Sequence, residues 1–392
     1  MRKAFICPTK YVQGQNELLN LGYFVKNFGA SALLVAGENT AKRVSSQLQK
    51  TAKKYGVTFV DTYFCGECTD AEIARLERLA KAKKCGCVVG LGGGKAIDTA
   101  KCVANGGPLI IAPTVAATDA PTSHSAVIYN EDGSFNRYAF FQKSPDVVLV
   151  DVSVIAKAPV RFLVSGMGDA LSTYFEARAT AASFSAVNAG LPCGALDKKA
   201  EPAVSTKTAL ALAELCYETL MEDAAKAKLA CEKGVVTPAL ENIVEANILL
   251  SGLGFESGGL AAAHAVQDGL TVLPETHDYY HGEKVAFGLL VQLVMENADE
   301  IDTVLSFCED IGLPVCLEDI GVTEISEKDL MKVAKKACDK DETIHSMPFP
   351  VTPEMVADAI LAADALGRDY KGLDDEDWDD EGWDDEEDED DE

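Results

Sequence analysis

The 392-residue sequence lacks any run of about 18 uncharged apolar residues, the length that a membrane-spanning helix requires. Residues 1–8 begin with basic side chains but contain no long apolar region and no small-residue cleavage site, which argues against an export signal. We therefore expect a cytoplasmic protein with no membrane span and no membrane partner.

Basic residues are scarce, since 35 lysines and arginines stand against 63 aspartates and glutamates, and the formal net charge is −28. Much of this charge is local: 16 of the 19 residues 374–392 are acidic, which leaves −12 for the rest of the chain. An acidic body argues against nucleic acid and anionic membranes as partners. Because residues 373–392 repel one another and bury little apolar surface, we predict a disordered acidic tail, either a solvating extension or a partner-binding segment.

Twelve cysteines do not make a dense disulfide framework in a chain of this length, and without an export signal a reducing cytosol is expected. Two closely spaced pairs, Cys65 with Cys68 and Cys85 with Cys87, allow a structural zinc site as one interpretation. The second pair has a single residue between its members and runs into an apolar stretch typical of a buried strand. We therefore favour core packing for these cysteines.

The order of apolar segments indicates two kinds of architecture. Short apolar runs at 32–37, 57–60, 87–91 and 109–113 alternate with helical patterns, which predicts βαβ units and a parallel sheet. Residues 125–152 suggest a hairpin followed by a return strand. After residue 159 the segments are rich in alanine and leucine at helical spacing. We predict an α/β domain over 1–159 and an all-helical domain over 160–372, with 187–203 as an irregular loop.

A glycine-rich segment, residues 90–98, lies between an apolar strand and a helix. Glycines there let the backbone approach a ligand closely, and a helix N-terminus offers unpaired N–H groups to a pyrophosphate. The segment is no P-loop, because the spacing fails at Val89 and Ala96, and Lys95 replaces the last glycine of the usual dinucleotide pattern. A nucleotide site and a structural tight turn both remain open. Glu38, after the first strand, is placed to bind the adenosine ribose, which favours NAD over NADP.

Only five histidines are present, and two of them, His264 and His281, lie in the helical half in Gly-rich or aromatic surroundings. A lone histidine in a helix is more often a core residue than a ligand. Asp169 stands where a helix is expected to open, so an N-cap is the alternative for this carboxylate. Together the three form a plausible metal site with an open fourth position, as catalytic Zn²⁺ requires. Spacing alone does not show that they meet.

Five motifs together resemble the glycerol dehydrogenases of the iron-containing, or type III, alcohol dehydrogenase superfamily. They are Gly-Gly-Gly-Lys-x-x-Asp-x-x-Lys (92–101), Ala-Pro-Thr-x-x-x-Thr-Asp-Ala-Pro (112–121), Gly-Asp-Ala-Leu (168–171), Gly-Phe-Glu-Ser-Gly-Gly-Leu-Ala-Ala-Ala-His (254–264) and His-x-Tyr-Tyr-His-Gly-Glu-Lys-Val-Ala-Phe-Gly (277–288). The resemblance covers nearly all of residues 1–370. It implies an N-terminal nucleotide-binding domain, a helical C-terminal domain, an active site in the cleft between them, and a homo-oligomer, by resemblance an octamer.

The same resemblance implies a role for each matching position. The zinc ligands would be Asp169, His264 and His281, and Asp119 would contact a substrate hydroxyl. The pyrophosphate loop and its helix would use Gly94, Lys95 and Asp98. The remaining NAD contacts would come from Glu38, Thr114, Ala117, Ser123, Ser125 and Tyr129. In iron-binding relatives a third histidine follows the metal aspartate by four residues; here that residue is Thr173, so three protein ligands and zinc fit better than four and iron.

Three features depart from the family pattern: Glu38 is longer than the usual aspartate, His124 replaces a small residue, and 187–203 is longer than its counterpart. The sequence as a whole predicts NAD-dependent oxidation of glycerol, or a related vicinal diol, to a hydroxyketone such as dihydroxyacetone. The zinc would lower the pKa of the hydroxyl that is oxidised.

Two other interpretations stay open. On the same fold, a dehydroquinate-synthase-like lyase or a polyol-phosphate dehydrogenase would need basic side chains around a phosphate, and only Arg178 and Lys284 lie near the ligand motifs. A scaffold protein that uses the acidic tail would need no catalytic site, which the intact metal and glycine motifs argue against.

Overall fold

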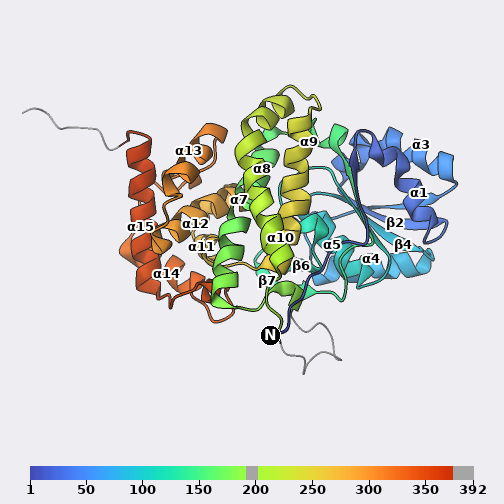
Figure 1. Cartoon of the computed structure of the whole chain (residues 1–392). Helices are drawn as coiled ribbons and strands as arrows, with labels where there is room; N and C mark the ends of the chain where they lie inside the picture. The colour runs from blue at the N-terminus through green and yellow to red at the C-terminus, as the bar shows by residue number, and fades with distance from the viewer. Residues whose placement is uncertain (191–201, 374–392) are drawn as a thin grey trace, which may run out of the picture.

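A computed structural model describes residues 1–190 and 202–373, and its two halves differ in architecture (Figure 1). A sheet flanked by helices forms the N-terminal half, at the right of Figure 1, and helices α11 to α15 lie at the far left. Residues 374–392 of the predicted tail and residues 191–201 of the predicted loop lie outside the described residues.

Six parallel strands form the main sheet in the order β1-β8-β5-β4-β2-β3. Alternate residues of β2 face opposite sides of this sheet: Leu33 packs in one hydrophobic cluster and Leu34 in another. Because both faces are covered, the inner strands are apolar along their whole length. The strand bounds are β1 Tyr11–Gly14, β2 Ser31–Ala36, β3 Thr58–Tyr63, β4 Cys87–Gly92, β5 Leu109–Pro113 and β8 Val147–Asp151.

The predicted hairpin and return strand are confirmed. Strands β6, Ser125–Tyr129, and β7, Phe135–Phe140, form a separate antiparallel pair, and β8 returns to the main sheet between β5 and β1. The short strand β1 was not predicted, because Tyr-Val-Gln-Gly has no apolar run and gains its partner only from β8, far along the chain.

The helices of the N-terminal half follow the predicted alternation, with one difference. The helical pattern that follows the first apolar run is two helices separated at Val44, whose buried side chain packs with Leu48 in the hydrophobic cluster that contains Leu34. The Thr69 hydroxyl caps the fourth helix by accepting from the backbone N–H of Glu72. The bounds are α1 Leu21–Lys26, α2 Glu38–Arg43, α3 Ser45–Tyr55, α4 Asp70–Ala82, α5 Gly94–Ala104 and α6 Val152–Ile155.

The second half is helical, as predicted, and its buried side chains join those of one sheet face in a single large hydrophobic cluster. A π-helical turn, Ala246–Leu250, links α9 to α10 without a break in the helical path. No helix among residues 1–190 and 202–373 has the length and apolar character needed to cross a membrane. The bounds are α7 Val160–Ser183, α8 Lys207–Glu232, α9 Pro238–Glu245, α10 Ser251–Gly258, α11 Ala262–Leu270, α12 His281–Glu296, α13 Ile301–Ile311, α14 Glu327–Ala337 and α15 Pro353–Tyr370.

Most of the described cysteines are buried, and they are spread over several elements. Cys68, Cys87 and Cys102 are buried, and Cys68 packs with Cys102 beneath β6. Cys65 is exposed. Within the part of the chain that the structure describes, the cysteines form no group of metal-ligand geometry.

Candidate active site

Three helices bring one carboxylate and two imidazoles together. Asp169 lies on α7, His264 on α11, and His281 is the first residue of α12. The Oδ1 atom of Asp169 is 3.3 Å from Nε2 of His264 and 3.3 Å from Nε2 of His281. Potential ligand atoms of all three lie within 4.8 Å of one another, and no other group of three or more such residues occurs among the described residues.

The Asp169 carboxylate has the properties of a metal ligand. It is 1% exposed, and its Oδ1 atom has no hydrogen-bond partner although it is buried. Burial raises the pKa of Asp169, but the two neighbouring histidines outweigh this effect and hold the pKa below its usual value. The N-cap interpretation is wrong, because α7 begins at Val160 and Asp169 lies well inside it. A carboxylate oxygen that faces two imidazole nitrogens is a donor set that suits tetrahedral Zn²⁺.

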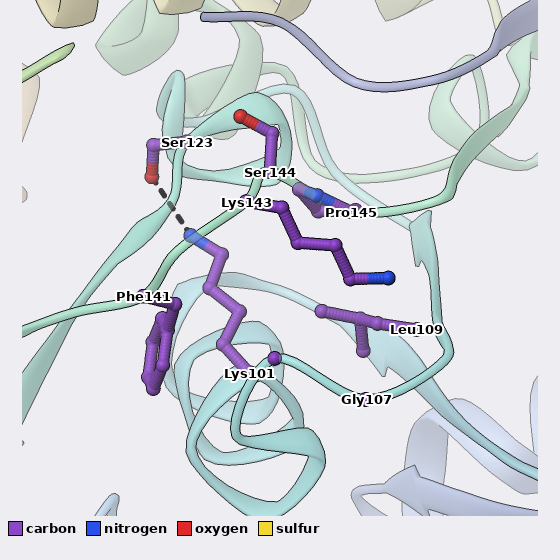
Figure 2. A pocket seen from close by; sticks show the side chains of 9 residues that line it. Lys101, Gly107, Leu109, Ser123, Phe141, Lys143, Ser144 and Pro145 are labelled. Carbon is purple, nitrogen blue, oxygen red and sulfur yellow. Dashed lines mark hydrogen bonds between the residues drawn. The ribbon is translucent and has the colours of Figure 1, made fainter. Parts of the chain in front are cut away.

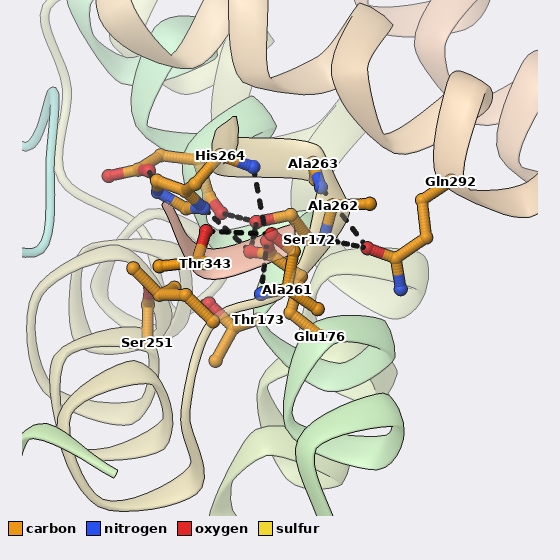
Figure 3. Close-up of polar contacts among 12 residues, drawn as sticks. Ser172, Thr173, Glu176, Ser251, Ala261, Ala262, Ala263, His264, Gln292 and Thr343 are labelled. Atoms are coloured by element: carbon orange, nitrogen blue, oxygen red, sulfur yellow. Dashed lines mark hydrogen bonds and ion pairs between the residues drawn. The ribbon is translucent and has the colours of Figure 1, made fainter. Parts of the chain in front are cut away.

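Glu176, two turns after Asp169 on α7, supports His264 (Figure 3). Its Oε2 lies 2.6 Å from Nδ1 of His264, and its Oε1 accepts from the backbone N–H groups of Ala261 and His264 at 2.8 and 3.0 Å. Burial lowers the pKa of His264, but Glu176 and Asp169 together raise it well above the usual value. Glu176 therefore fixes the ring with Nε2 directed at Asp169.

Sequence reasoning missed Glu176, although a signal was present. Residues seven apart lie on the same face of a helix, so Asp169 and Glu176 form a pair of carboxylates on one face of an otherwise apolar segment. Gln292 was missed as well: its Oε1 accepts from the N–H groups of Ala262 and Ala263 at 3.1 Å and anchors the start of α11. No local pattern marks this glutamine.

The start of α12 sets the position of His281. A Cβ atom on Gly282 would lie 1.7 Å from the carbonyl oxygen of Ser165, so only glycine lets α12 begin directly against α7. Glu283 accepts from the backbone N–H of Tyr280 at 2.7 Å and receives two hydrogen bonds from Arg161, at 2.6 and 2.8 Å. The His281 side chain remains 39% exposed, so the group is open on this side.

Asp119 joins the metal-ligand group from the other half of the chain. It follows β5, and its backbone N–H donates to Oδ2 of Asp169 at 3.3 Å. Its own Oδ2 accepts from the Ser251 hydroxyl at 2.8 Å. Burial, and then the charge of Asp169, raise the pKa of Asp119 well above its usual value. The residue that the sequence associated with a substrate hydroxyl therefore lies beside the three candidate ligands.

The glycine segment and Glu38 lie at one edge of the sheet. Strands β2 and β4 are neighbours, with Ala36 paired to Leu91, so the segments that follow them emerge side by side. From this pair the chain continues outward to β3 on one side and to β5 on the other. Such a reversal in strand order is where open α/β sheets bind nucleotides. Glu38 begins α2 and Gly94 begins α5 at this point.

Two glycines of this segment differ in their surroundings. A Cβ atom on Gly90 would lie 2.7 Å from Cβ of Ala100, so this glycine serves the packing of α5 on β4. A Cβ atom on Gly94 would meet nothing within 4 Å. The first turn of α5 is therefore open at Gly94, as the approach of a pyrophosphate requires.

The charged residues at this edge are exposed and paired with neighbours. Oε1 of Glu38 lies 2.6 Å from Nζ of Lys42, and Nζ of Lys95 lies 2.6 Å from Oε2 of Glu67. The Lys95 ammonium is also 6.0 Å from the ring centre of Tyr129, at the end of β6. Lys95 and Tyr129 are thus neighbours at the start of α5.

Other predicted cofactor residues face the protein interior. The buried Lys101 ammonium donates to the Ser123 hydroxyl at 2.8 Å (Figure 2). It also donates to the carbonyl oxygens of Ala120 and Ser125 at 2.6 and 2.7 Å. Asp98 lies 3.7 Å from the same ammonium and accepts from the backbone N–H of Val127, while burial raises its pKa. Asp98 and Ser123 therefore fix the position of the Lys101 side chain and of the backbone from Ala120 to Val127 around it.

The cavity in Figure 2, beside Lys101 and Ser144, does not suit a substrate. Its volume is about 10 Å³, which is room for about one water.

Two further predicted cofactor contacts, Thr114 and Ala117, follow β5. Thr114 is buried, and its backbone N–H donates to the carbonyl of Gly92 at 3.0 Å, while Ala117 is half-buried.

Residues 114–125, which carry Asp119 and several of the predicted cofactor contacts, are attached to the helical half. The Asn247 side chain donates to the carbonyl of Ala116 at 3.0 Å. The buried Glu256 carboxylate accepts from the backbone N–H of His124 at 2.9 and 3.1 Å and contacts Nδ1 of its ring. His124, the departure noted in the sequence, thus adds a contact between the two halves.

The chain is similar to known proteins in both sequence and fold. Residues 8–152 match the model of the family described as iron-containing alcohol dehydrogenase. The chain is 47% identical to a glycerol dehydrogenase of Escherichia coli over 93% of this chain and 97% of that protein. It is 49% identical to a glycerol dehydrogenase of Thermotoga maritima over 92% and 96%. The crystal structure of a probable glycerol dehydrogenase from Sinorhizobium meliloti superposes with a TM-score of 0.85 at 42% identity, covering 93% of this chain and 99% of that one.

Proposed function

The chain belongs to the iron-containing alcohol dehydrogenase family and is an oxidoreductase, and from this premise we propose that it oxidises glycerol or a related vicinal diol with NAD. The product would be a hydroxyketone, dihydroxyacetone in the case of glycerol. Asp169, His264 and His281 would hold one divalent metal ion, and zinc suits this three-residue donor set. The observation that carries the proposal is the buried, unpartnered Oδ1 atom of Asp169 between two imidazole nitrogens.

Each group of residues at the site would have its own role in this reaction. When bound, the metal supplies a Lewis acid that lowers the pKa of a substrate hydroxyl, and NAD supplies the hydride acceptor. Glu176 keeps Nε2 of His264 directed at the ligand group. Asp119, whose backbone N–H bonds to Asp169, would accept a hydrogen bond from a second hydroxyl of the substrate. Gly94 and the first turn of α5 would receive the pyrophosphate of NAD.

The charges near the site favour a neutral substrate. Arg178 is paired with Glu296 and Glu300, and Lys284 donates to the carbonyl of Thr276. Both basic residues that the sequence placed near the ligands therefore have partners elsewhere, while Asp119 and Asp169 bring negative charge to the site. A phosphate group would meet these carboxylates without a compensating cation from Arg178 or Lys284. We therefore favour an uncharged polyol over a polyol phosphate, and the dehydrogenase relatives leave the lyase interpretation without support.

A metal analysis combined with a substrate panel tests the proposal. The purified chain should contain about one divalent metal per chain and reduce NAD with glycerol or 1,2-propanediol. A chelator should abolish this activity, and zinc should restore it better than iron(II). Full activity in the metal-free protein, or turnover of a polyol phosphate but of no neutral diol, would contradict it.

A further inference from the structure

Two hydroxyl side chains that the proposed mechanism does not use form a chain of hydrogen bonds that ends on Asp119. The Ser251 hydroxyl donates to Oδ2 of Asp119 at 2.8 Å. The Thr173 hydroxyl lies 2.9 Å from the Ser251 oxygen. All three side chains are buried, and the two hydroxyl residues are at most 1% exposed.

The direction of these hydrogen bonds follows from the protons available. The Ser251 hydroxyl has one proton and donates it to Asp119, so Thr173 donates to the Ser251 oxygen. The two hydroxyls thus form a short chain that ends on one oxygen of Asp119. Hydrogen bonds in such a chain strengthen one another in a buried environment.

The three residues come from separate elements that meet only in the folded chain. Asp119 follows β5, Ser251 is the first residue of α10, and Thr173 lies on α7 one turn after Asp169. Thr173 therefore shares a helix face with Asp169. Because Ser251 occupies Oδ2, the Oδ1 oxygen of Asp119 is left for a ligand, and no donor among the described residues is bonded to it.

We propose that Ser251, itself held by Thr173, is a positioning residue that orients the Asp119 carboxylate to receive the second hydroxyl of a vicinal diol. This inference rests on the proposed function and extends it from activity to specificity. Without the Ser251 proton, the carboxylate can rotate, and a diol loses its advantage over a simple alcohol. An alcohol with one hydroxyl never uses Asp119 and should be insensitive to the change.

The test compares 1,2-propanediol with 2-propanol in the metal-loaded protein with saturating NAD. In Ser251→Ala, we expect kcat/KM for the diol to fall about tenfold, mainly through KM, since the hydrogen bond that orients the Asp119 carboxyl group is lost. We expect kcat/KM for 2-propanol and KM for NAD to change less than about twofold. Thr173→Val should show a smaller loss in the same direction, and Thr173→Ser, which keeps the hydroxyl, should behave as the unmodified chain.

Ser257→Ala is the matched control, because Ser257 is a buried serine of the same helix whose hydroxyl accepts from the backbone N–H of Ile6, outside the site. A Ser251→Ala variant that loses activity equally towards both alcohols, or towards neither, overturns the inference. The inference is also overturned if Thr173→Ser loses as much kcat/KM for the diol as Thr173→Val does. Absence of metal-dependent diol oxidation in the unmodified chain would instead overturn the proposed function, so the two failures are distinguishable.

Discussion

The two halves of the molecule present their candidate ligand sites in different ways. In the helical half, the metal-ligand group consists of side chains, and buried partners such as Glu176 hold them in place. In the α/β half, the candidate pyrophosphate site is backbone at the carboxyl edge of a sheet, in the first turn of α5 at Gly94. The charged side chains at this edge, Glu38 and Lys95, are exposed.

This difference indicates how each site responds to substitution. A site built from side chains depends on each of them and on the groups that orient them. A site built from backbone depends on the path of the chain and tolerates changes in exposed side chains. Substitutions in the helical half should therefore have the larger effects, and the following predictions test that contrast.

The largest effect is expected for His281→Ala. Loss of one of three candidate ligands should remove the bound metal and lower kcat/KM for glycerol roughly 1,000-fold or more, because a Lewis acid contributes several kcal/mol to the transition state. The affinity for NAD, measured by fluorescence titration of NADH, should be nearly unchanged. Near-normal turnover would refute the role of His281, and loss of NADH binding would show that the two sites are not separable.

A smaller loss is expected for Glu176→Gln, which keeps the size of the side chain but weakens the hydrogen bond to His264. Metal affinity, measured by competition with a chelator, should fall about 10- to 100-fold. Asp223→Asn is a matched control, since Asp223 is a buried carboxylate of the same half whose partners, Lys226 and Asn242, lie outside the site. Equal metal loss in both variants would assign the effect to general destabilisation.

In the nucleotide site, a methyl group added to the backbone is the comparable test. Gly94→Ala should leave thermal stability unchanged but raise the Kd for NADH about tenfold, since the methyl group enters space that is open for the pyrophosphate. Gly90→Ala should instead lower stability by about 1–3 kcal/mol through overpacking against Ala100. Should Gly94→Ala bind NADH as tightly as the unmodified chain, the first turn of α5 is not the pyrophosphate site.

The smallest effect is expected at an exposed side chain. Glu38→Gln should lower the preference for NAD over NADP about two- to fivefold, because exposed charges contribute well under 1.5 kcal/mol. Lys42→Gln, which removes the partner of Glu38, should leave the preference unchanged or raise it. Measurement of kcat/KM with both cofactors distinguishes these outcomes. A much larger fall in the preference for NAD with Glu38→Gln would contradict the expectation that exposed side chains matter less in the α/β half.

Much of the fold was predictable because its signals are local. The alternation of apolar runs and helical patterns, the hairpin near Glu131 and the Thr69 cap all depend on residues close together in the sequence. Strand β1 and the true start of α7 were missed because tertiary contacts decide them. The pairing of Tyr11 with Val148 cannot be read from a four-residue segment.

The candidate site divides along the same line. Asp169, His264 and His281 were predicted through motifs, and the structure brings them together. Glu176 and Ser251 were not predicted, because a buried glutamate or serine is recognisable only when its partners on other elements are known. The roles of Asp98 and Ser123 in cofactor binding stay predictions, since their side chains are engaged with Lys101.

The contacts of residues 114–125 with the helical half bear on how the chain folds. Ala116, Asp119 and His124 find their buried hydrogen-bond partners on Asn247, Ser251 and Glu256. Separation of the halves would exchange each of these hydrogen bonds for one with water, at a net cost of about 0.5–1.5 kcal/mol each, and would expose apolar surface of the shared cluster. The two proposed domains differ in architecture but should not unfold separately, so we expect the whole chain to melt in one cooperative transition. Residues 1–159 alone should be unable to hold residues 114–125 in this conformation.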